Sequence, residues 1–369
     1  MRILRIPCPI VGNNNPVPWR AMIRNFLAVG KEKGGSRMKV LFYGTNSYDE
    51  HFFKKIMDEY PQISIDFTDA NIHKETAALA MGYEAVCAFV NADLGGEVIR
   101  ELAEYGVKLI LMRCAGFNNV DLRQAAESRV EVRRVPGYSP QAVAEHAMAL
   151  ALTANRHTHK AYIKCRENDF SLTGLMGVNF FGKTAGIIGT GKIGRAMADI
   201  CRGFGMRVIG YDKYENPETG IHYLPLEQVL RESDLLSLHC PLTDETRHLI
   251  NKTTIGSMKD GVILVNTSRG GLIRTEDLID GIRAGKFFAV GLDVYEEETP
   301  YVYEDLSDQI MQTSTMARLL SFPNVVVTSH QGFLTVEAVE AIARTTLQNA
   351  VDSMEGRATS NELTGLMQE

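Results

Sequence analysis

A glycine-rich hexapeptide in the middle of the chain, residues 189–194 (GTGKIG), constrains the fold more than any other part of the sequence. It follows a short apolar run at residues 184–188 and precedes a helical pattern at residues 195–200. A second apolar run, residues 206–211, ends at Asp212, 18 residues after the last of the three glycines. Strand, G-x-G-x-x-G, helix, strand and acid in this order form the fingerprint of a dinucleotide-binding βαβ unit.

Each glycine of the fingerprint has its own physical role. Gly189 allows a tight turn, Gly191 lets the backbone approach a pyrophosphate, and Gly194 lets the helix pack closely on the strand. A glycine-rich turn without a ligand, or an acid that merely ends a strand, does not explain the whole order of elements. Asp212 would accept hydrogen bonds from both ribose hydroxyls and repel a 2′-phosphate, which predicts NAD rather than NADP. Lys213, the next residue, could weaken this preference.

Composition excludes two kinds of partner. The 369 residues allow two domains, and 45% of them are hydrophobic and 23% charged, as in ordinary globular proteins. With a net charge of −6 and no run of 18 apolar residues, neither nucleic acid nor a membrane is an expected partner. The six cysteines never form C-x-x-C and fall mostly in apolar patterns. They predict buried free thiols in a reducing, cytoplasmic compartment, and no metal site.

The first 37 residues differ in character from the rest. Seven of them are lysine or arginine, and Glu32 is the single acidic residue. Transit peptides are also basic and acid-poor, but they are rich in serine, and here Ser36 is alone. We therefore interpret residues 1–37 as a disordered extension, or as the result of a start codon placed too early, with Met38 as the true start.

Residues 39–135 alternate short apolar runs with helical patterns, as a parallel, doubly wound α/β domain does. The predicted strands are 40–43, 63–67, 85–90, 108–112 and 130–135, and the predicted helices are 48–60, 95–105 and 119–128. Two prolines and a glycine interrupt the pattern at 136–140. A long helix is then predicted from 141 to about 165.

A second α/β unit begins with the fingerprint. Its predicted strands, as in a complete Rossmann sheet, are 184–188, 208–211, 235–239, 262–266, 290–293 and 325–328. The tail beyond them, helical over 335–353, is too short to form a domain and should return to the first unit. We expect two Rossmann-like or flavodoxin-like domains with a cleft between them and two chain crossings. The substrate domain would comprise residues 38–138 and 334–369, and the NAD-binding domain residues 139–333.

Three ionisable residues follow predicted strands of the second unit. Arg269, Glu298 and His330 come after its fourth, fifth and sixth strands. The carboxyl ends of parallel strands share one edge of the sheet, and ligands of open α/β sheets bind there. Reduction of a 2-keto acid needs a cation for the carboxylate, a proton donor, and a partner that orients the donor. Arg269 suits the first task, His330 the second and Glu298 the third, although each residue alone has an ordinary structural explanation.

Further motifs extend over the chain from Met38 onward. They are 113–121 (RCAGFNNVD), 135–140 (VPGYSP), 144–147 (AEHA), 186–194 (GIIGTGKIG), 239–243 (HCPLT), 265–270 (VNTSRG), 293–296 (DVYE) and 330–333 (HQGF). Arg269, Glu298 and His330 follow one another at spacings of 29 and 32 residues. In these features the chain resembles the D-isomer-specific 2-hydroxyacid dehydrogenases. Within this family it is most similar to the fermentative, NAD-dependent members that form D-lactate.

The resemblance implies additional site residues. Ala115 and Gly116 match a loop whose backbone N–H groups bind the substrate carboxylate. Tyr138 matches a tyrosine that contacts substrate, and Phe333 matches an aromatic residue near the methyl end of pyruvate. Beside the fingerprint glycines, the positions that match dinucleotide contacts are Lys192, Ile193, Asp212, Cys240, Pro241, Thr246, Ser268 and Asp293. His146 lies within the long predicted helix, so we expect it to have a packing role rather than a catalytic one.

The function that the resemblance implies is reversible hydride transfer between NADH and pyruvate, giving D-lactate. A bulkier 2-keto acid, such as 2-ketoisocaproate or phenylpyruvate, is the alternative, because one methylene changes discrimination by only about 1–3 kcal/mol. A non-enzymatic, NAD-sensing scaffold is a third hypothesis, and the joint presence of Arg269, Glu298 and His330 argues against it. The long predicted helix lies where the family forms its two-fold interface, which implies a homodimer or a higher homo-oligomer.

Overall fold

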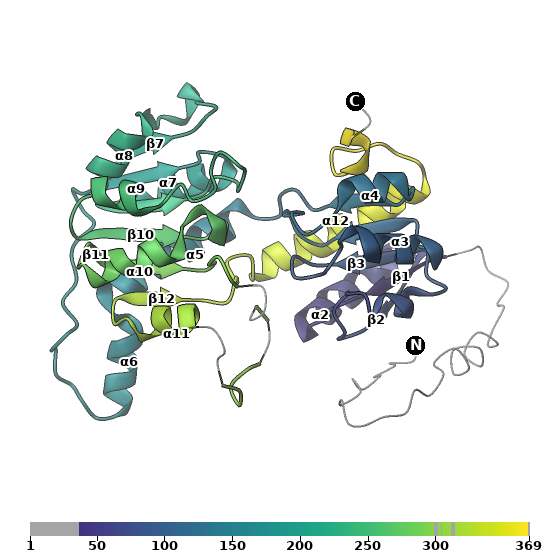
Figure 1. The fold of residues 1–369 in the computed structure, drawn as a ribbon, viewed down its shortest axis with the longest axis horizontal. Coiled ribbons are helices and arrows are strands. Elements are labelled where there is room, and N and C mark those ends of the chain that lie inside the picture. The colour runs from purple at the N-terminus through teal and green to yellow at the C-terminus, as the bar shows by residue number, and fades with distance from the viewer. Residues whose placement is uncertain (1–36, 299–301, 304, 311–313, 368–369) are drawn as a thin grey trace. The chain divides into compact units, whose positions relative to one another are not determined.

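The structure is a computed structural model that describes residues 37–298, 302–303, 305–310 and 314–367. The extension expected at residues 1–37 therefore lies, except for Arg37, outside the described residues. The chain divides into two compact units, Met1–Tyr138 with Val339–Glu369, and Ser139–Ala338. Figure 1 shows the helices and strands of both units and labels those for which there is room. Each unit contains one parallel sheet, which confirms the expected α/β class with two doubly wound sheets. The cleft between the units stays a prediction.

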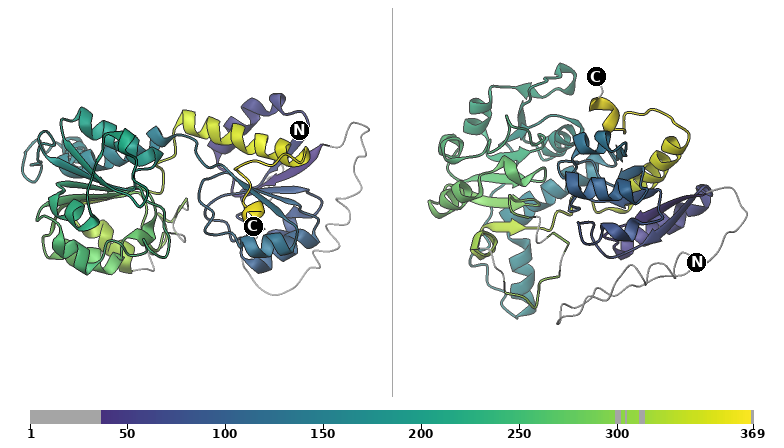
Figure 2. Two further views of the ribbon diagram at one scale, coloured as in Figure 1. Left: turned by 90° about the horizontal axis from the view of Figure 1, so that it is seen from above. Right: turned by 45° about the vertical axis from the view of Figure 1, so that its right-hand side comes forward.

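The first unit contains a five-stranded sheet in the order β2-β1-β3-β4-β5. Its strands, all parallel, are β1 (Met38–Phe42), β2 (Ile63–Phe67), β3 (Ala85–Ala88), β4 (Leu109–Met112) and β5 (Glu131–Arg134). The central strands β3 and β4 are buried throughout because helices cover both faces of the sheet (Figure 2), whereas only Ile63 is buried on the edge strand β2. The helical segments of this unit are α2 (Ser47–Ile56), η1 (Met57–Glu59), η2 (Ala77–Ala80), α3 (Gly96–Glu104), α4 (Leu122–Glu127) and η5 (Thr364–Met367).

The chain returns to the first unit through α12 (Val336–Met354). Ala343, Leu347 and Ala350 on this helix belong to the same buried core as Phe42 of β1 and Phe53 of α2. Farther on, the backbone N–H of Leu363 donates to the carbonyl of Val132 on β5 over 2.8 Å. A tail too short to bury its own apolar face is thus stabilised on a sheet made from the start of the chain.

The second unit contains a seven-stranded parallel sheet in the order β12-β11-β10-β9-β6-β7-β8. Its strands are β6 (Thr184–Ile188), β7 (Arg207–Tyr211), β8 (His222–Tyr223), β9 (Leu235–Leu238), β10 (Val262–Asn266), β11 (Phe287–Leu292) and β12 (Val325–Val327). One face packs on α5 (Pro140–Arg156) and α7 (Lys192–Gly203), and the other on α8 (Leu226–Glu232), α9 (Lys252–Ser257), α10 (Thr275–Arg283) and α11 (Ser314–Ser321). The order reverses between β6 and β9, and ligands of doubly wound sheets bind at such a point.

Two sequence expectations about the second unit were wrong in detail. The sheet has a seventh strand, β8, which is only two residues long and lies at the edge, so it has no apolar run to reveal it. The helix expected over 141–165 is two helices, α5 and α6 (Thr158–Arg166). They are separated at His157, whose φ of 51° is left-handed and cannot continue an α-helix.

Two further findings concern the cysteines and the hydropathy of the helices. Cys87, Cys114, Cys201 and Cys240 are buried and take part in no disulfide among the described residues, as expected, and Cys8 lies outside the described residues. Cys165 is free but exposed, because it lies on α6, none of whose residues is buried. Of the helices in the described part of the chain, none combines the length and the apolar character that crossing a membrane requires.

Candidate active site and dinucleotide site

The fingerprint glycines adopt the geometry that a pyrophosphate requires. Gly189 has a φ of +88°, and a Cβ there would lie 2.3 Å from the backbone nitrogen of Cys240. A Cβ on Gly194 would lie 2.0 Å from the carbonyl oxygen of Gly189, so α7 packs directly on the turn. A Cβ on Gly191 would meet no protein atom within 4 Å. The backbone is thus open at Gly191, just before α7 begins at Lys192, and a phosphate can reach the helix N-terminus there.

Asp212 is tied to this turn from the end of β7. Its Oδ2 accepts hydrogen bonds from the backbone N–H and the hydroxyl of Thr190, over 2.6 and 3.1 Å. Its Oδ1 accepts from the backbone N–H of Tyr214 over 2.8 Å. Lys213, which could weaken the preference for NAD, instead pairs with the exposed Glu245 over 2.8 Å. The carboxylate is therefore fixed beside the fingerprint, where the adenosine ribose of NAD is expected.

Four other expected dinucleotide contacts are brought together beside Gly189. The Ser268 hydroxyl donates to the carbonyl of Cys240 over 2.7 Å, and the Thr246 hydroxyl donates to the carbonyl of Pro241 over 2.7 Å. Burial raises the pKa of the Cys240 thiol to about 11, so this thiol is neutral at physiological pH. Lys192 and Ile193 form the first turn of α7. The residues present, an open glycine turn, a fixed carboxylate and neutral polar groups, fit an NAD molecule.

His330 and Glu298 form a hydrogen-bonded pair. The two atoms, Nδ1 of His330 and Oε1 of Glu298, are 3.1 Å apart, and the side chains are 17% and 16% exposed. Because a carboxylate only accepts, the proton of the imidazole lies on Nδ1 in this arrangement. Glu298 Oε2 accepts from the backbone N–H of Tyr295 over 3.3 Å, which fixes the carboxylate from the other side. A histidine oriented in this way is suited to transfer a proton at Nε2.

Arg269 belongs to a segment that packs against the Glu298 segment. A Cβ on Gly270 would lie 2.1 Å from the carbonyl carbon of Tyr295, so only glycine allows the two backbones this close approach. The Arg269 carbonyl accepts from the amide of Asn266 over 2.9 Å, and its guanidinium donates to the carbonyl of Ser268 over 2.6 Å. The backbone after β10 and the backbone after β11 are therefore in contact, one bearing Arg269 and the other Glu298.

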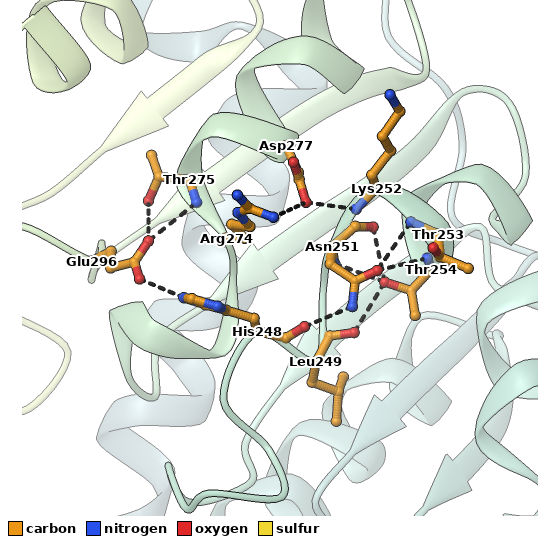
Figure 3. Close-up of polar contacts among 10 residues, drawn as sticks. All are labelled: His248, Leu249, Asn251, Lys252, Thr253, Thr254, Arg274, Thr275, Asp277 and Glu296. Atoms are coloured by element: carbon orange, nitrogen blue, oxygen red, sulfur yellow. Dashed lines mark hydrogen bonds and ion pairs between the residues drawn. The ribbon is translucent and has the colours of Figure 1, made fainter.

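A polar cluster that the sequence did not reveal anchors the Glu298 segment (Figure 3). Glu296 contacts Nε2 of His248 over 2.5 Å, and it accepts from the backbone N–H and hydroxyl of Thr275 over 3.3 and 3.4 Å. Thr275 begins α10, so the carboxylate also lies at a positive helix end. In the sequence, Glu296 was noted only as the last residue of the 293–296 motif (DVYE). Its partners lie 48 and 21 residues away, and no local pattern links them.

Removing this anchor should cost stability. We expect Glu296→Ala to lower the free energy of unfolding by about 1 kcal/mol, because hydrogen bonds to charged groups contribute about 1.5–3 kcal/mol and this side chain is partly exposed. The matched control is Glu297→Ala, the exposed neighbour, which should change stability by less than about 0.5 kcal/mol. Urea denaturation measures both. Equal losses in the two variants would contradict an anchoring role.

The expected substrate loop lies in the first unit. The carbonyl of Ala115 accepts from the Arg134 guanidinium over 3.0 Å, and the carbonyl of Gly116 accepts from the thiol of Cys114 over 3.3 Å. The Arg134 guanidinium also lies 4.9 Å from the centre of the Phe117 ring. These contacts fix both peptide planes of the loop. Tyr138 is the last residue of the same stretch of chain.

The other expected site residues belong to the second unit. Phe333 is buried within it. Asp293, expected to contact the dinucleotide, is 1% exposed and accepts a hydrogen bond from His146. Its Oδ2 accepts from the backbone N–H of Gly332 over 2.8 Å. Oδ2 thus accepts fewer of the hydrogen bonds to this carboxylate than Oδ1, which accepts from His146, Thr328 and Gln331.

The chain is similar in sequence to known proteins. Residues 148–332 match the sequence profile of the "D-isomer specific 2-hydroxyacid dehydrogenase, NAD binding domain". The D-lactate dehydrogenase of Escherichia coli (strain K12) is 46% identical over 329 residues, which are 88% of this chain and 100% of that protein.

Two solved structures are also similar. The pyruvate reductase of Chlamydomonas reinhardtii has a TM-score of 0.84 at 43% identity and covers 88% of this chain and 99% of its own. D-lactate dehydrogenase from Aquifex aeolicus, complexed with NAD and lactic acid, has a TM-score of 0.76 at 31% identity, with 86% and 96% covered. These findings confirm the resemblance, the enzyme class and the cofactor expected from the sequence. The chain therefore belongs to the D-isomer-specific 2-hydroxyacid dehydrogenases, with residues 148–332 as its NAD-binding domain.

Proposed function

We propose that this dehydrogenase reduces pyruvate to D-lactate with NADH, in a reversible reaction. The observation that carries the proposal is the His330–Glu298 pair, on the same sheet edge as Arg269 and the dinucleotide turn. The similarity to D-lactate dehydrogenases at 46% identity supports pyruvate as the substrate. The small-molecule substrate is then a 2-keto acid, which has the carboxylate and the carbonyl that these residues can recognise.

Each proposed catalytic residue has a distinct task. Arg269 would exchange its bond to the Ser268 carbonyl for a planar, bidentate contact with the substrate carboxylate. The backbone N–H groups of Ala115 and Gly116 would bind the same carboxylate, and Tyr138 and Phe333 would contact the rest of the substrate. NADH supplies a hydride to the carbonyl carbon when it is bound. His330 donates a proton from Nε2 to the carbonyl oxygen, and Glu298 stabilises the protonated imidazole that precedes this transfer.

A substrate panel tests this function. Purified protein is assayed with NADH and NADPH against pyruvate, 2-ketoisocaproate and phenylpyruvate, and the product is analysed on a chiral column. We expect the highest kcat/KM with pyruvate and NADH, and D-lactate as the product. A much higher kcat/KM for a bulkier keto acid would reassign the substrate. Binding of NADH without turnover of any keto acid would favour a scaffold function instead.

Cofactor preference should depend on the charge of Asp212. We expect Asp212→Asn to reduce discrimination against NADPH by about 10- to 100-fold, because the like-charge repulsion of the 2′-phosphate is lost while the Thr190 contact can persist. Adding Glu245→Gln releases Lys213 from its ion pair and should improve NADPH use further. The control is Asp199→Asn, an exposed acid on α7. The ratio of kcat/KM for NADH to that for NADPH measures the effect, and an unchanged ratio in the double variant would contradict it.

We also propose that the protein is a homodimer. Helix α5, expected at the interface, lies largely within the core of its own unit, so the candidate surface is α6 and the segment after it. Four apolar side chains on that segment, Phe170, Leu172, Met176 and Phe181, are between 74% and 86% exposed. Burial of large apolar side chains on a second copy would remove this surface from water.

Analytical ultracentrifugation tests the homodimer. We expect the wild type to sediment as a dimer and the Phe170→Asp/Leu172→Asp variant to sediment as a monomer. The control is Met81→Asp in the first unit, and a monomeric wild type would contradict the proposal.

A further inference from the structure

His146, on α5, contacts the carboxylate of Asp293 in the second unit. Its Nε2 lies 3.1 Å from Asp293 Oδ1 and 3.1 Å from the hydroxyl oxygen of Thr328. The Thr328 hydroxyl gives its single hydrogen to Asp293 Oδ1 over 2.5 Å. Since neither partner has a hydrogen left to give, Nε2 of His146 bears a proton and donates to both. The geometry thus assigns the tautomer of this histidine.

Asp293 in turn holds the backbone that includes His330. The backbone N–H of His330 donates to the Asp293 carbonyl over 2.9 Å. The next two N–H groups, of Gln331 and Gly332, donate to Oδ1 and Oδ2 over 2.9 and 2.8 Å. The N–H groups of Gln331 and Gly332 each donate to one oxygen of the carboxylate, and hydrogen bonds to the charged form favour that form. Burial acts to raise the pKa of Asp293, but the hydrogen bonds from His146 and Thr328 outweigh it and lower this pKa, so the carboxylate is ionised.

The turn at His330 needs such support. His330 has a φ of +48°, a left-handed conformation that a side chain with a Cβ adopts only when its surroundings hold it there. Asp293 holds the N–H side of the turn, and the hydroxyl of Tyr303 donates to the His330 carbonyl over 3.0 Å on the other side. The direction of the imidazole toward Glu298 follows from this backbone conformation.

We propose that His146 is a positioning residue for the reaction. Its Nε2–H fixes the Asp293 carboxylate within the turn formed by residues 330–332, and this turn sets the direction of the His330 imidazole. His146 touches no reacting atom and acts only through Asp293. Its effect on catalysis rests on the proposed function, whereas its effect on the turn does not.

Two variants separate the hydrogen bond from the packing. His146→Leu keeps a side chain of similar bulk without a donor, and His146→Gln restores an N–H near the position of Nε2. The matched control is Glu145→Gln, the exposed preceding residue on the same helix.

Hydrogen exchange of the NAD-free protein measures the turn directly. We expect the amides of Gln331 and Gly332 to exchange about tenfold faster in His146→Leu than in the wild type, because the turn opens more often. His146→Gln should return exchange toward the wild-type rate, and Glu145→Gln should leave it unchanged. Equal exchange in the wild type and His146→Leu would overturn the proposal.

Steady-state kinetics at saturating NADH measure the consequence for catalysis. We expect His146→Leu to lower kcat by about 10- to 100-fold with little change in the KM for pyruvate, because a displaced imidazole slows proton transfer more than it weakens binding. His146→Gln should recover most of this loss. A kcat unchanged by His146→Leu would overturn the catalytic part of the proposal.

The two assays distinguish failure of this proposal from failure of the proposed function. A wild-type protein that turns over no 2-keto acid contradicts the function, while the exchange comparison still decides whether His146 holds the turn. If His146→Leu does not fold, Thr328→Val removes another donor from the same oxygen of Asp293 and should produce the same changes in exchange and kcat. Wild-type behaviour of Thr328→Val would then overturn the proposal.

Discussion

Replacing His330 by glutamine is expected to lower kcat by about 10²- to 10⁴-fold, the contribution typical of a positioned general acid. Glutamine matches the reach of the imidazole but cannot give up a proton at neutral pH. The hydrogen bond between Nδ1 and Glu298 is lost as well, because glutamine has no N–H at the position of Nδ1. Steady-state assays with pyruvate and NADH measure the change.

The affinity for NADH separates this chemical role from a structural one. Quenching or enhancement of NADH fluorescence should give the same Kd in His330→Gln and in the wild type, because the fingerprint turn and Asp212 are unaltered. His51→Gln, an exposed substitution on α2, is the control. Turnover that survives in His330→Gln would remove His330 from the proton-donor role.

Replacing Arg269 by lysine should lower kcat/KM for pyruvate by about 10²- to 10³-fold. A guanidinium binds a carboxylate through two parallel hydrogen bonds, which a lysine cannot reproduce, and the substrate is then held less accurately for hydride transfer. Steady-state kinetics over a range of pyruvate concentrations give the value. The control is Arg274→Lys, an exposed arginine paired with Asp277 over 3.9 Å.

Methyl pyruvate makes the test of Arg269 specific. This ester has the carbonyl of pyruvate without the carboxylate, so it cannot form the bidentate contact. We expect Arg269→Lys to change kcat/KM for the ester by less than about threefold, because a substitution can remove only interactions that the substrate actually makes. The kcat/KM for pyruvate should fall by about 10²- to 10³-fold in the same variant. Equal losses for both substrates would mean that Arg269 supports the site structurally and does not bind the carboxylate.

The central strands and the dinucleotide turn were predictable because their signals are local. A buried parallel strand is a short apolar run, and the fingerprint glycines are needed wherever a strand, a turn and a helix pack this closely. Gly189 and Gly194 have no space for a Cβ in the structure, which is the physical reason for their residue type. The position of Asp212 followed from the same unit, since it ends the next strand.

Local signals failed where a conformation depends on distant contacts. The edge strand β8 has only two residues, and pairing with β7 alone defines it. The break between α5 and α6 at His157 was hidden because both flanking segments are helical in pattern. The same holds for the Glu296 anchor, whose partners are His248, in the segment before α9, and Thr275, the first residue of α10.

The sequence by itself determined the α/β class, the NAD-binding unit and the residue types at the carboxyl ends of the strands, because these depend on patterns within about thirty residues. Only the tertiary structure decided how those residues are held. It placed His146, 147 residues before Asp293, against the carboxylate that supports the His330 turn, and it packed Gly270 on the backbone that leads to Glu298. Such contacts join segments far apart in the chain, and their geometry exists only after the sheet and its helices have packed.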